Sequence, residues 1–268
     1  MTSAPRLQPR AAHPLTLVAA VGLTLTAVLG VAAHLVPQPG LNPVSLTISD
    51  YAVSDRGWPM NLAILLLGLT SLAVPAALRA ARVAVGGVVQ VLLLVWGFGL
   101  TAAAIVPTDP IGTVGLTTTG YVHRYVSVGA FIALPVATLL ALRPLAADVR
   151  WRDAVPRLRA LAVASVLGLL LLYYVAFPGG RAMMGLVERG LVVIELCLLA
   201  VLVARLHRIS HRPRRPAAGS EPWLIGPRPL AAGPDIRRHR RRGVRVAGVG
   251  RRRPVPGAAE PGGAGRRG

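Results

Sequence analysis

Six long apolar segments constrain the fold of this chain more than any other feature of its sequence. An α-helix needs about 20 apolar residues to cross a bilayer core ~30 Å thick, and each segment meets this length. Only 15% of the residues are charged, against roughly 25% in soluble domains, so a water-soluble enzyme core is excluded. The sequence therefore predicts an all-α fold, a polytopic transmembrane bundle of six helices. The predicted spans are Leu15–Val36, Trp58–Leu78, Val83–Val106, Tyr125–Leu142, Leu158–Phe177 and Leu186–Ala204.

The predicted spans divide the chain into a short N-terminal segment (1–14), a six-helix transmembrane domain (15–206) and a basic tail (207–268). The first span has an alternative interpretation as a cleaved signal peptide, because Arg6 and Arg10 precede it and Val31-Ala32-Ala33 resembles a cleavage site. Its apolar stretch is longer than the 7–15 residues typical of a signal peptide. We interpret it as an uncleaved span.

The orientation follows from the arginines beside the spans, because such arginines are retained on the cytoplasmic side. One set of connections, with the N-terminal segment, holds nine arginines, whereas the other set holds four. The nine-to-four difference predicts a multi-pass protein of the cell membrane with both termini in the cytoplasm. The minority set consists of Arg56, Arg124, Arg181 and Arg189.

The C-terminal tail differs in composition from the rest of the chain. Residues 205–268 hold 17 of the 30 arginines, and beyond His211 the sequence is mostly Pro, Gly, Ala and Arg. Such a composition cannot bury a core and predicts disorder. Besides the bilayer itself, anionic lipid headgroups are one partner of this tail, at ~1 kcal/mol per arginine. Nucleic acid is disfavoured because Trp223 is its one aromatic residue, and an incidental extension without function is the remaining interpretation.

Polar residues outside the basic clusters gather at the predicted outer ends of the spans. Charges this close to lipid are costly unless they are paired or hydrated. We therefore expect these residues to converge, with Arg189 or Arg124 paired to Asp50 or Asp109. The candidate polar cluster consists of Ser49, Asp50, Asp109, His123, Glu188 and Arg189.

Several short motifs at this face occur together and in order. They are Asn42-Pro43-x-Ser45-x-x-x-Ser49-Asp50-Tyr51, Pro107-Thr108-Asp109-Pro110, His123 and Gly185-x-x-Glu188-Arg189. With the six-span plan, residues 12–206 resemble the membrane family catalogued as domain-of-unknown-function (DUF) family 998. The resemblance implies the fold but no activity, and the tail lies outside it.

Three residues carry chemistry that the pattern leaves open. Asp109 is either a metal ligand or general base, or a loop cap that accepts backbone hydrogen bonds. His123 is either a ligand or proton shuttle, or a half-hydrated interfacial histidine. Glu195 lies near mid-membrane, where an ionised carboxylate costs roughly 2.5–3.5 kcal/mol or more. It shares a helix face with Glu188, seven residues earlier, and is predicted to point inward, either for proton or cation handling or for a structural contact.

Three functions compete at this point. The first is a non-enzymatic carrier or binder of a small molecule or lipid, with an outward polar vestibule over Glu195. The second is an intramembrane metal-dependent hydrolase that uses Asp50, Asp109 and His123, although His13 is predicted on the opposite face and histidine ligands are scarce. The third is a structural or assembly partner in the cell envelope. No catalytic residue, metal site or cofactor is assigned, and nucleotide, HExxH, GxSxG and haem motifs are absent from the sequence.

Overall fold

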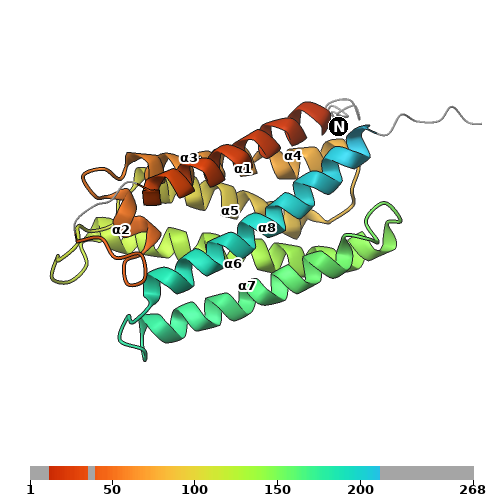
Figure 1. Ribbon diagram of the computed structural model, residues 1–268. Coiled ribbons are helices and arrows are strands. Elements are labelled where there is room, and N and C mark those ends of the chain that lie inside the picture. The colour runs from red at the N-terminus through yellow and green to blue at the C-terminus, as the bar shows by residue number, and fades with distance from the viewer. Residues whose placement is uncertain (1–11, 36–39, 212–268) are drawn as a thin grey trace, which may run out of the picture. The chain divides into compact units, whose positions relative to one another are not determined.

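The computed structural model describes residues 12–35 and 40–211, and this part of the chain is helical without strands (Figure 1). The predicted disordered tail, apart from the end of the last helix, lies outside the described residues, as does the start of the N-terminal segment. The helices are α1 (Ala12–Leu35), α2 (Ile48–Ala52), α3 (Trp58–Ser71), α4 (Ala73–Ala80), α5 (Gly87–Ile105), α6 (Thr118–Ala147), α7 (Val155–Ala176) and α8 (Met184–His211).

The all-α membrane fold is confirmed, and the structure is consistent with six spans. Five helical stretches are long and apolar enough to cross a membrane, namely α1, α3 together with α4, α5, α6 and α7. The sixth predicted span, Leu186–Ala204, lies within α8, which is not among these five and carries Glu188, Arg189 and Glu195. The protein is thus an all-α transmembrane bundle.

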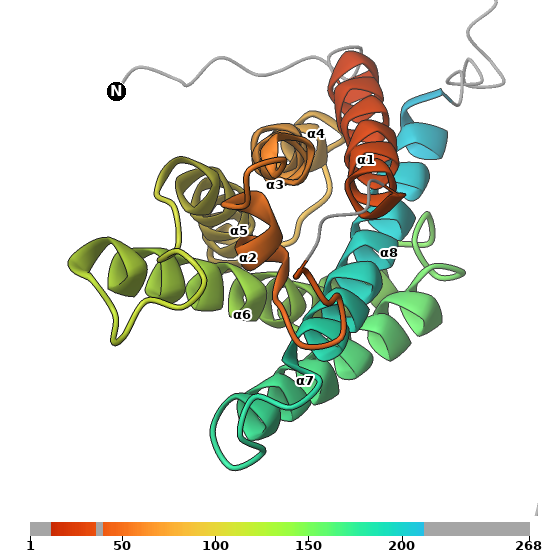
Figure 2. The same ribbon diagram turned by 60° about the vertical axis from the view of Figure 1, so that its left-hand side comes forward.

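Each long helix packs against the next one in the sequence, and α8 returns to pack against α1 (Figure 2). The inward faces of these helices form one continuous apolar core. Trp96 on α5 is 1% exposed, and its indole N–H donates to the Ser71 hydroxyl of α3 at 3.1 Å. A buried indole needs such a partner, so this bond ties two neighbouring spans together.

The second span is interrupted at Leu72, between α3 and α4. Pro75 lies three residues further on. A proline has no N–H to donate, and its ring clashes with the carbonyl four residues earlier, which here belongs to Ser71. The break therefore falls where the proline removes the helical hydrogen bond. Pro135, in contrast, lies inside the continuous helix α6.

Glycines let two of these helices approach closely. A Cβ at Gly68 of α3 would lie 2.9 Å from the Gly97 carbonyl oxygen of α5, and a Cβ at Gly97 would lie 2.5 Å from the Leu72 side chain. Contacts this short leave no room for a methyl group. The α3–α5 interface therefore depends on small residues, as is common between membrane helices.

The helix boundaries differ from the predicted ones by a few residues, most at the start of α6 and at the end of α8, and one short helix was not predicted. Helix α6 begins at Thr118 and not at Tyr125, because the hydroxyl of Thr117 accepts a hydrogen bond from the Gly120 N–H at 3.1 Å and caps the helix. The connection between the first two spans contains the short helix α2, which the hydropathy pattern does not indicate. Its signal is a capping box: Thr47 accepts from the Asp50 N–H, and the Asp50 carboxylate accepts from the Thr47 N–H.

The bundle has two ends that differ in composition. We call the α2 end the one that holds α2, the start of α6 and the start of α8. The other, the α4 end, holds the start of α1, the end of α4, the connection 148–154 and the end of α8 (Figure 1).

Candidate functional site

The segment 40–47 and α2 cover the start of α8 at the α2 end. The Leu186 N–H donates to the Val44 carbonyl at 3.0 Å, which satisfies a donor that the first helical turn leaves unpaired. A Cβ at Gly185 would lie 2.6 Å from the Pro43 carbonyl oxygen and would also meet the Leu46 carbonyl. Glycine is therefore required where this segment crosses α8.

His123 and Ser49 form a hydrogen-bonded pair at this end. His123 on α6 is 6% exposed, and its Nδ1 lies 2.7 Å from the Val106 carbonyl oxygen. That nitrogen must be the protonated one, since a carbonyl only accepts. The other ring nitrogen, Nε2, lies 2.9 Å from Ser49 Oγ on α2, and in the tautomer with its proton on Nδ1 the serine hydroxyl is the donor of this bond.

Arg189 fastens the 40–47 segment to α8. One terminal nitrogen of its guanidinium donates to the carbonyls of Pro43, Leu46 and Gly185 at 3.0, 2.6 and 3.0 Å. Its Nε donates to His34 Nε2 at 2.8 Å. The guanidinium carbon also lies 4.7 Å above the centre of the Tyr51 ring, in cation–π range. The charge of Arg189 is thus stabilised by carbonyl oxygens, a histidine nitrogen and an aromatic ring, although its other terminal nitrogen is buried without a hydrogen-bond partner among the described residues.

The predicted ion pair between Arg189 or Arg124 and Asp50 or Asp109 is not among the salt bridges found in residues 12–35 and 40–211. Asp50 is engaged in the cap of α2. Asp109 accepts from both the Thr117 N–H, at 3.0 Å, and the Thr117 hydroxyl, at 2.5 Å. Both carboxylates therefore cap helices, which for Asp109 is the loop-cap interpretation.

Glu188 is 7% exposed and accepts a hydrogen bond from the Ile48 N–H at 2.9 Å. This N–H belongs to the first residue of α2, so Glu188 anchors α2 to α8. Asp50 belongs to α2 itself, and four more of the six predicted polar residues meet in or around this helix. We call this group, with the two aromatic rings that join it, the α2-end cluster: Ser49, His123, Glu188, Arg189, His34 and Tyr51.

Glu195 lies deeper in the bundle, on the same buried face of α8 as Glu188. It is 0% exposed, and neither carboxylate oxygen has a hydrogen-bond partner among the residues that the structure describes. Its neighbours along this face include Leu191, Leu198 and Leu199. The predicted inward orientation is therefore confirmed. The carboxyl group lies among leucines on the buried face of α8.

The α4 end is held by charged groups. Arg150 donates to Asp148 at 2.6 Å and to the Ala81 carbonyl at 3.1 Å, and Arg205 donates to Asp153 at 2.8 Å. The side-chain hydrogen bond from Arg150 is the largest influence on Asp148 and lowers the pKa of this carboxyl below its ordinary 3.8, against an opposing effect of burial. The same bond raises the pKa of Arg150.

The comparison with known proteins gives one family match, which covers most of the helical bundle. The model of a protein family described as "Protein of unknown function (DUF998)" matches residues 17–205. The chain belongs to the DUF998 family. No curated protein and no solved structure matches it. The DUF998 match includes the whole α2-end cluster and Glu195 but stops before the end of α8.

Proposed function

We propose that this DUF998 protein is a non-enzymatic membrane protein that binds or carries an amphiphilic small molecule or lipid, with Glu195 as the group that holds its cationic or hydrogen-donating part. The observation that supports this proposal is the buried Glu195 carboxyl group, whose two oxygens have no hydrogen-bond partner among the described residues. An unsatisfied buried polar group costs roughly 1–3 kcal/mol. Such a group in a membrane helix marks a site for a proton or a ligand.

The helices beside Glu195 leave a narrow, mostly apolar crevice. A crevice between α1, the α3–α4 break and α8 is lined by seven residues, one of which, Leu199, is one helical turn from Glu195. Five of the seven are apolar and two carry hydroxyl groups, and the space between them does not admit a water molecule, so a ligand would have to separate α1 from α8 to enter. The lining residues are Ala19, Leu23, Thr70, Ser71, Val74, Leu199 and Val203.

Two measurements on the purified protein test this function. Infrared difference spectra across a pH series should show the carbonyl band of a protonated carboxyl group that Glu195→Gln abolishes. Equilibrium dialysis with tetraphenylphosphonium, a cationic amphiphile, should show binding that Glu195→Gln weakens at least about tenfold, or 1.4 kcal/mol. Glu188→Gln is the matched control on the same helix face, because Glu188 already has the Ile48 N–H as its partner. Equal probe binding by the wild type and Glu195→Gln would overturn the proposal.

A second candidate function rests on the Ser49–His123 pair. A serine hydroxyl that donates to a histidine, whose other nitrogen is held by an oriented acceptor, is the arrangement of an activated nucleophile. This favours an acyl-transfer or hydrolytic reaction without metal over the metal-dependent hydrolase, since Asp50 and Asp109 are engaged in helix caps. A fluorophosphonate probe should then label the protein, and Ser49→Ala should abolish labelling while the exposed Ser45→Ala preserves it. Absence of labelling would remove this candidate.

We also infer that both termini lie on the cytoplasmic side of the cell membrane, from the nine-to-four arginine difference. Val114 is 101% exposed at the α2 end, and Val149 is 69% exposed at the α4 end. In a Cys197→Ser background, an impermeant thiol reagent applied to intact cells should label Val114→Cys but not Val149→Cys. Labelling of Val149→Cys alone would reverse the orientation.

A further inference from the structure

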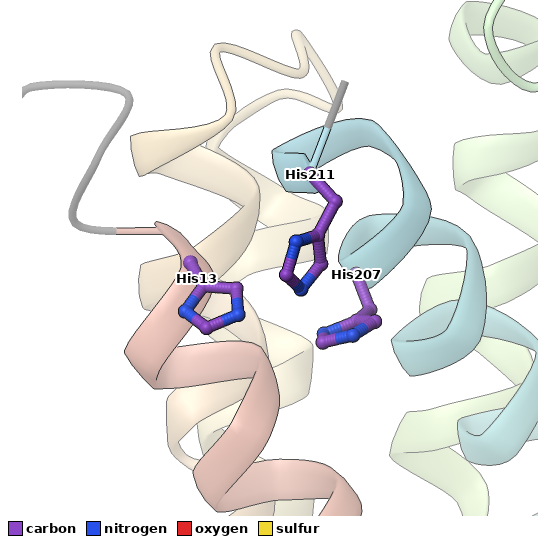
Figure 3. A group of neighbouring side chains, drawn as sticks. All are labelled: His13, His207 and His211. Atoms are coloured by element: carbon purple, nitrogen blue, oxygen red, sulfur yellow. The ribbon is translucent and has the colours of Figure 1, made fainter. Parts of the chain in front are cut away.

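Three histidines from the first and last spans meet at the α4 end (Figure 3). His13 comes from α1, and His207 and His211 come from α8. Each offers one ring nitrogen such that all three atoms lie within 4.8 Å of one another. The ring centres of His13 and His207 lie 4.1 and 4.2 Å from that of His211. In the described part of the chain, this is the one group of three or more His, Cys, Asp or Glu with metal-binding spacing.

The helical spacing explains why the two histidines of α8 lie side by side. Residues four apart lie on the same face of a helix, so His207 and His211 both point towards the neighbouring helix α1. Because α8 packs along α1, the start of α1 brings His13 to this face. All three histidines lie outside residues 17–205, so the group is a feature of this chain and does not follow from the DUF998 match.

A nearby hydroxyl group fixes the tautomer of His207. Thr16 on α1 donates its hydroxyl proton to the His13 carbonyl oxygen at 2.8 Å. The same oxygen lies 3.2 Å from His207 Nδ1, and with its proton already used it must accept the Nδ1 proton. His207 Nε2 therefore keeps a free lone pair. Metal-binding histidines characteristically donate their second ring nitrogen to such a partner, which orients the ring.

We propose that His13, His207 and His211 form a binding site for a transition-metal dication, with Zn²⁺ as the best match. Neutral imidazole suits Zn²⁺, Cu²⁺ and Ni²⁺ and not Ca²⁺ or Mg²⁺, which take oxygen ligands. Three histidines with an open fourth position are a known zinc arrangement. Bonds of about 2.1 Å in tetrahedral geometry place the nitrogens about 3.4 Å apart, so the group must contract. His211 is exposed at the last residue of α8, whereas His13 and His207 are half-buried, so its ring has the most room to shift inward.

The site would join the first span to the last span through side chains of α1 and α8. Metal binding to the folded state stabilises it by mass action, so the metal clamps α1 to α8. This inference does not depend on the proposed function, because Glu195 belongs to another part of α8.

The test uses the full chain, purified without a polyhistidine tag and titrated with Co²⁺ and then Zn²⁺. The wild type should bind one ion per chain, show the intense visible bands of tetrahedral Co²⁺ and lose them on Zn²⁺ addition. It should also melt at higher temperature with Zn²⁺. His211→Ala should weaken Zn²⁺ binding at least about tenfold and abolish the melting shift, and the exposed position of His211 keeps the fold intact.

Two further variants separate a metal site from a packing contact of rings. Thr16→Val leaves all three ligands in place, and it should weaken Zn²⁺ binding by about 10–100-fold, as loss of an orienting partner does. His34→Gln changes a histidine at the opposite end of α1 and should leave binding unchanged. Zn²⁺ affinity of His211→Ala equal to that of the wild type, or binding lost equally in His34→Gln, would overturn the proposal.

Discussion

The two ends of the bundle are held together by different kinds of bond. At the α2 end, Arg189 donates hydrogen bonds to backbone carbonyls of the 40–47 segment, and Glu188 accepts one from a backbone N–H of α2. At the α4 end, Arg150 and Arg205 are paired with Asp148 and with the 72%-exposed Asp153. The first end therefore depends on one connection holding its shape, whereas the second depends on charges that contact water.

Because of this difference, we expect the two ends to respond differently to substitution, pH and salt. Hydrogen bonds from a charged side chain contribute about 1.5–3 kcal/mol each, and a buried group left without its partner costs about as much. Exposed ion pairs contribute roughly 0–1 kcal/mol and are screened by salt. We expect substitutions to affect the α2 end most, and pH and salt to act mainly on the α4 end.

The largest effect is expected for Arg189→Met. It leaves the carbonyls of Pro43 and Leu46 without their donor, and so releases the 40–47 segment from α8. The free energy of unfolding should fall by about 3 kcal/mol or more, measured by thermal or denaturant unfolding of the detergent-solubilised protein. Arg181→Met, at an exposed position in the preceding connection, is the control and should be neutral. Equal stability of the two variants would contradict the assigned importance of the carbonyl contacts.

A smaller loss is expected for Gly185→Ala. Its methyl group would meet the Leu46 and Pro43 carbonyls, and backbone atoms cannot give way as a flexible side chain can. Overpacking of this kind costs about 1–3 kcal/mol. Gly190→Ala on the same helix meets no atom within 4 Å and should be neutral or stabilising by up to about 1 kcal/mol. The comparison fails if both variants unfold at the same temperature.

The smallest effect is expected for Asp148→Asn at the α4 end. Because the folded pKa of Asp148 is lowered, by Arg150 above all, its carboxylate stabilises the fold above pH ~4, the value for an unpaired Asp. That stabilisation is lost as the pH falls through the lowered folded pKa. The melting temperatures of the wild type and Asp148→Asn should differ slightly at pH 7 and converge in acid and in high salt. A difference that persists in acid would indicate a role for Asp148 other than charge.

The spans could be predicted because a bilayer requires long apolar helices, and those runs are directly visible in the sequence. The face on which Ser49, His123, Glu188 and Arg189 meet could also be predicted, since alternate connections share one side. Their partners could not. His123 and Arg189 bind the carbonyls of Val106, Pro43 and Leu46, and any residue supplies a carbonyl, so the side-chain pattern carries no trace of these bonds.

Two features did leave a signal in the sequence. The Thr47-x-x-Asp50 capping box marks α2 inside a connection that we predicted only as a loop. The spacing of His207 and His211 marks a helix face, and the prediction of both termini on one side already places His13 beside it. The sequence prediction uses His13 only as a residue of the face opposite to His123, and does not group it with His207 and His211.

The packing of α1 against α8 has a consequence for how the protein is made. A membrane protein is synthesised from its N-terminus, so α1 enters the bilayer long before α8 leaves the ribosome. Until then, α1 packs only with its next neighbours, α3 and α4, and Thr16 and His34 lack the partners that His207 and Arg189 later provide. Assembly of this bundle is therefore completed only when α8 enters it. In a nascent chain that stops before residue 189, the face of α1 that packs against α8 has no partner.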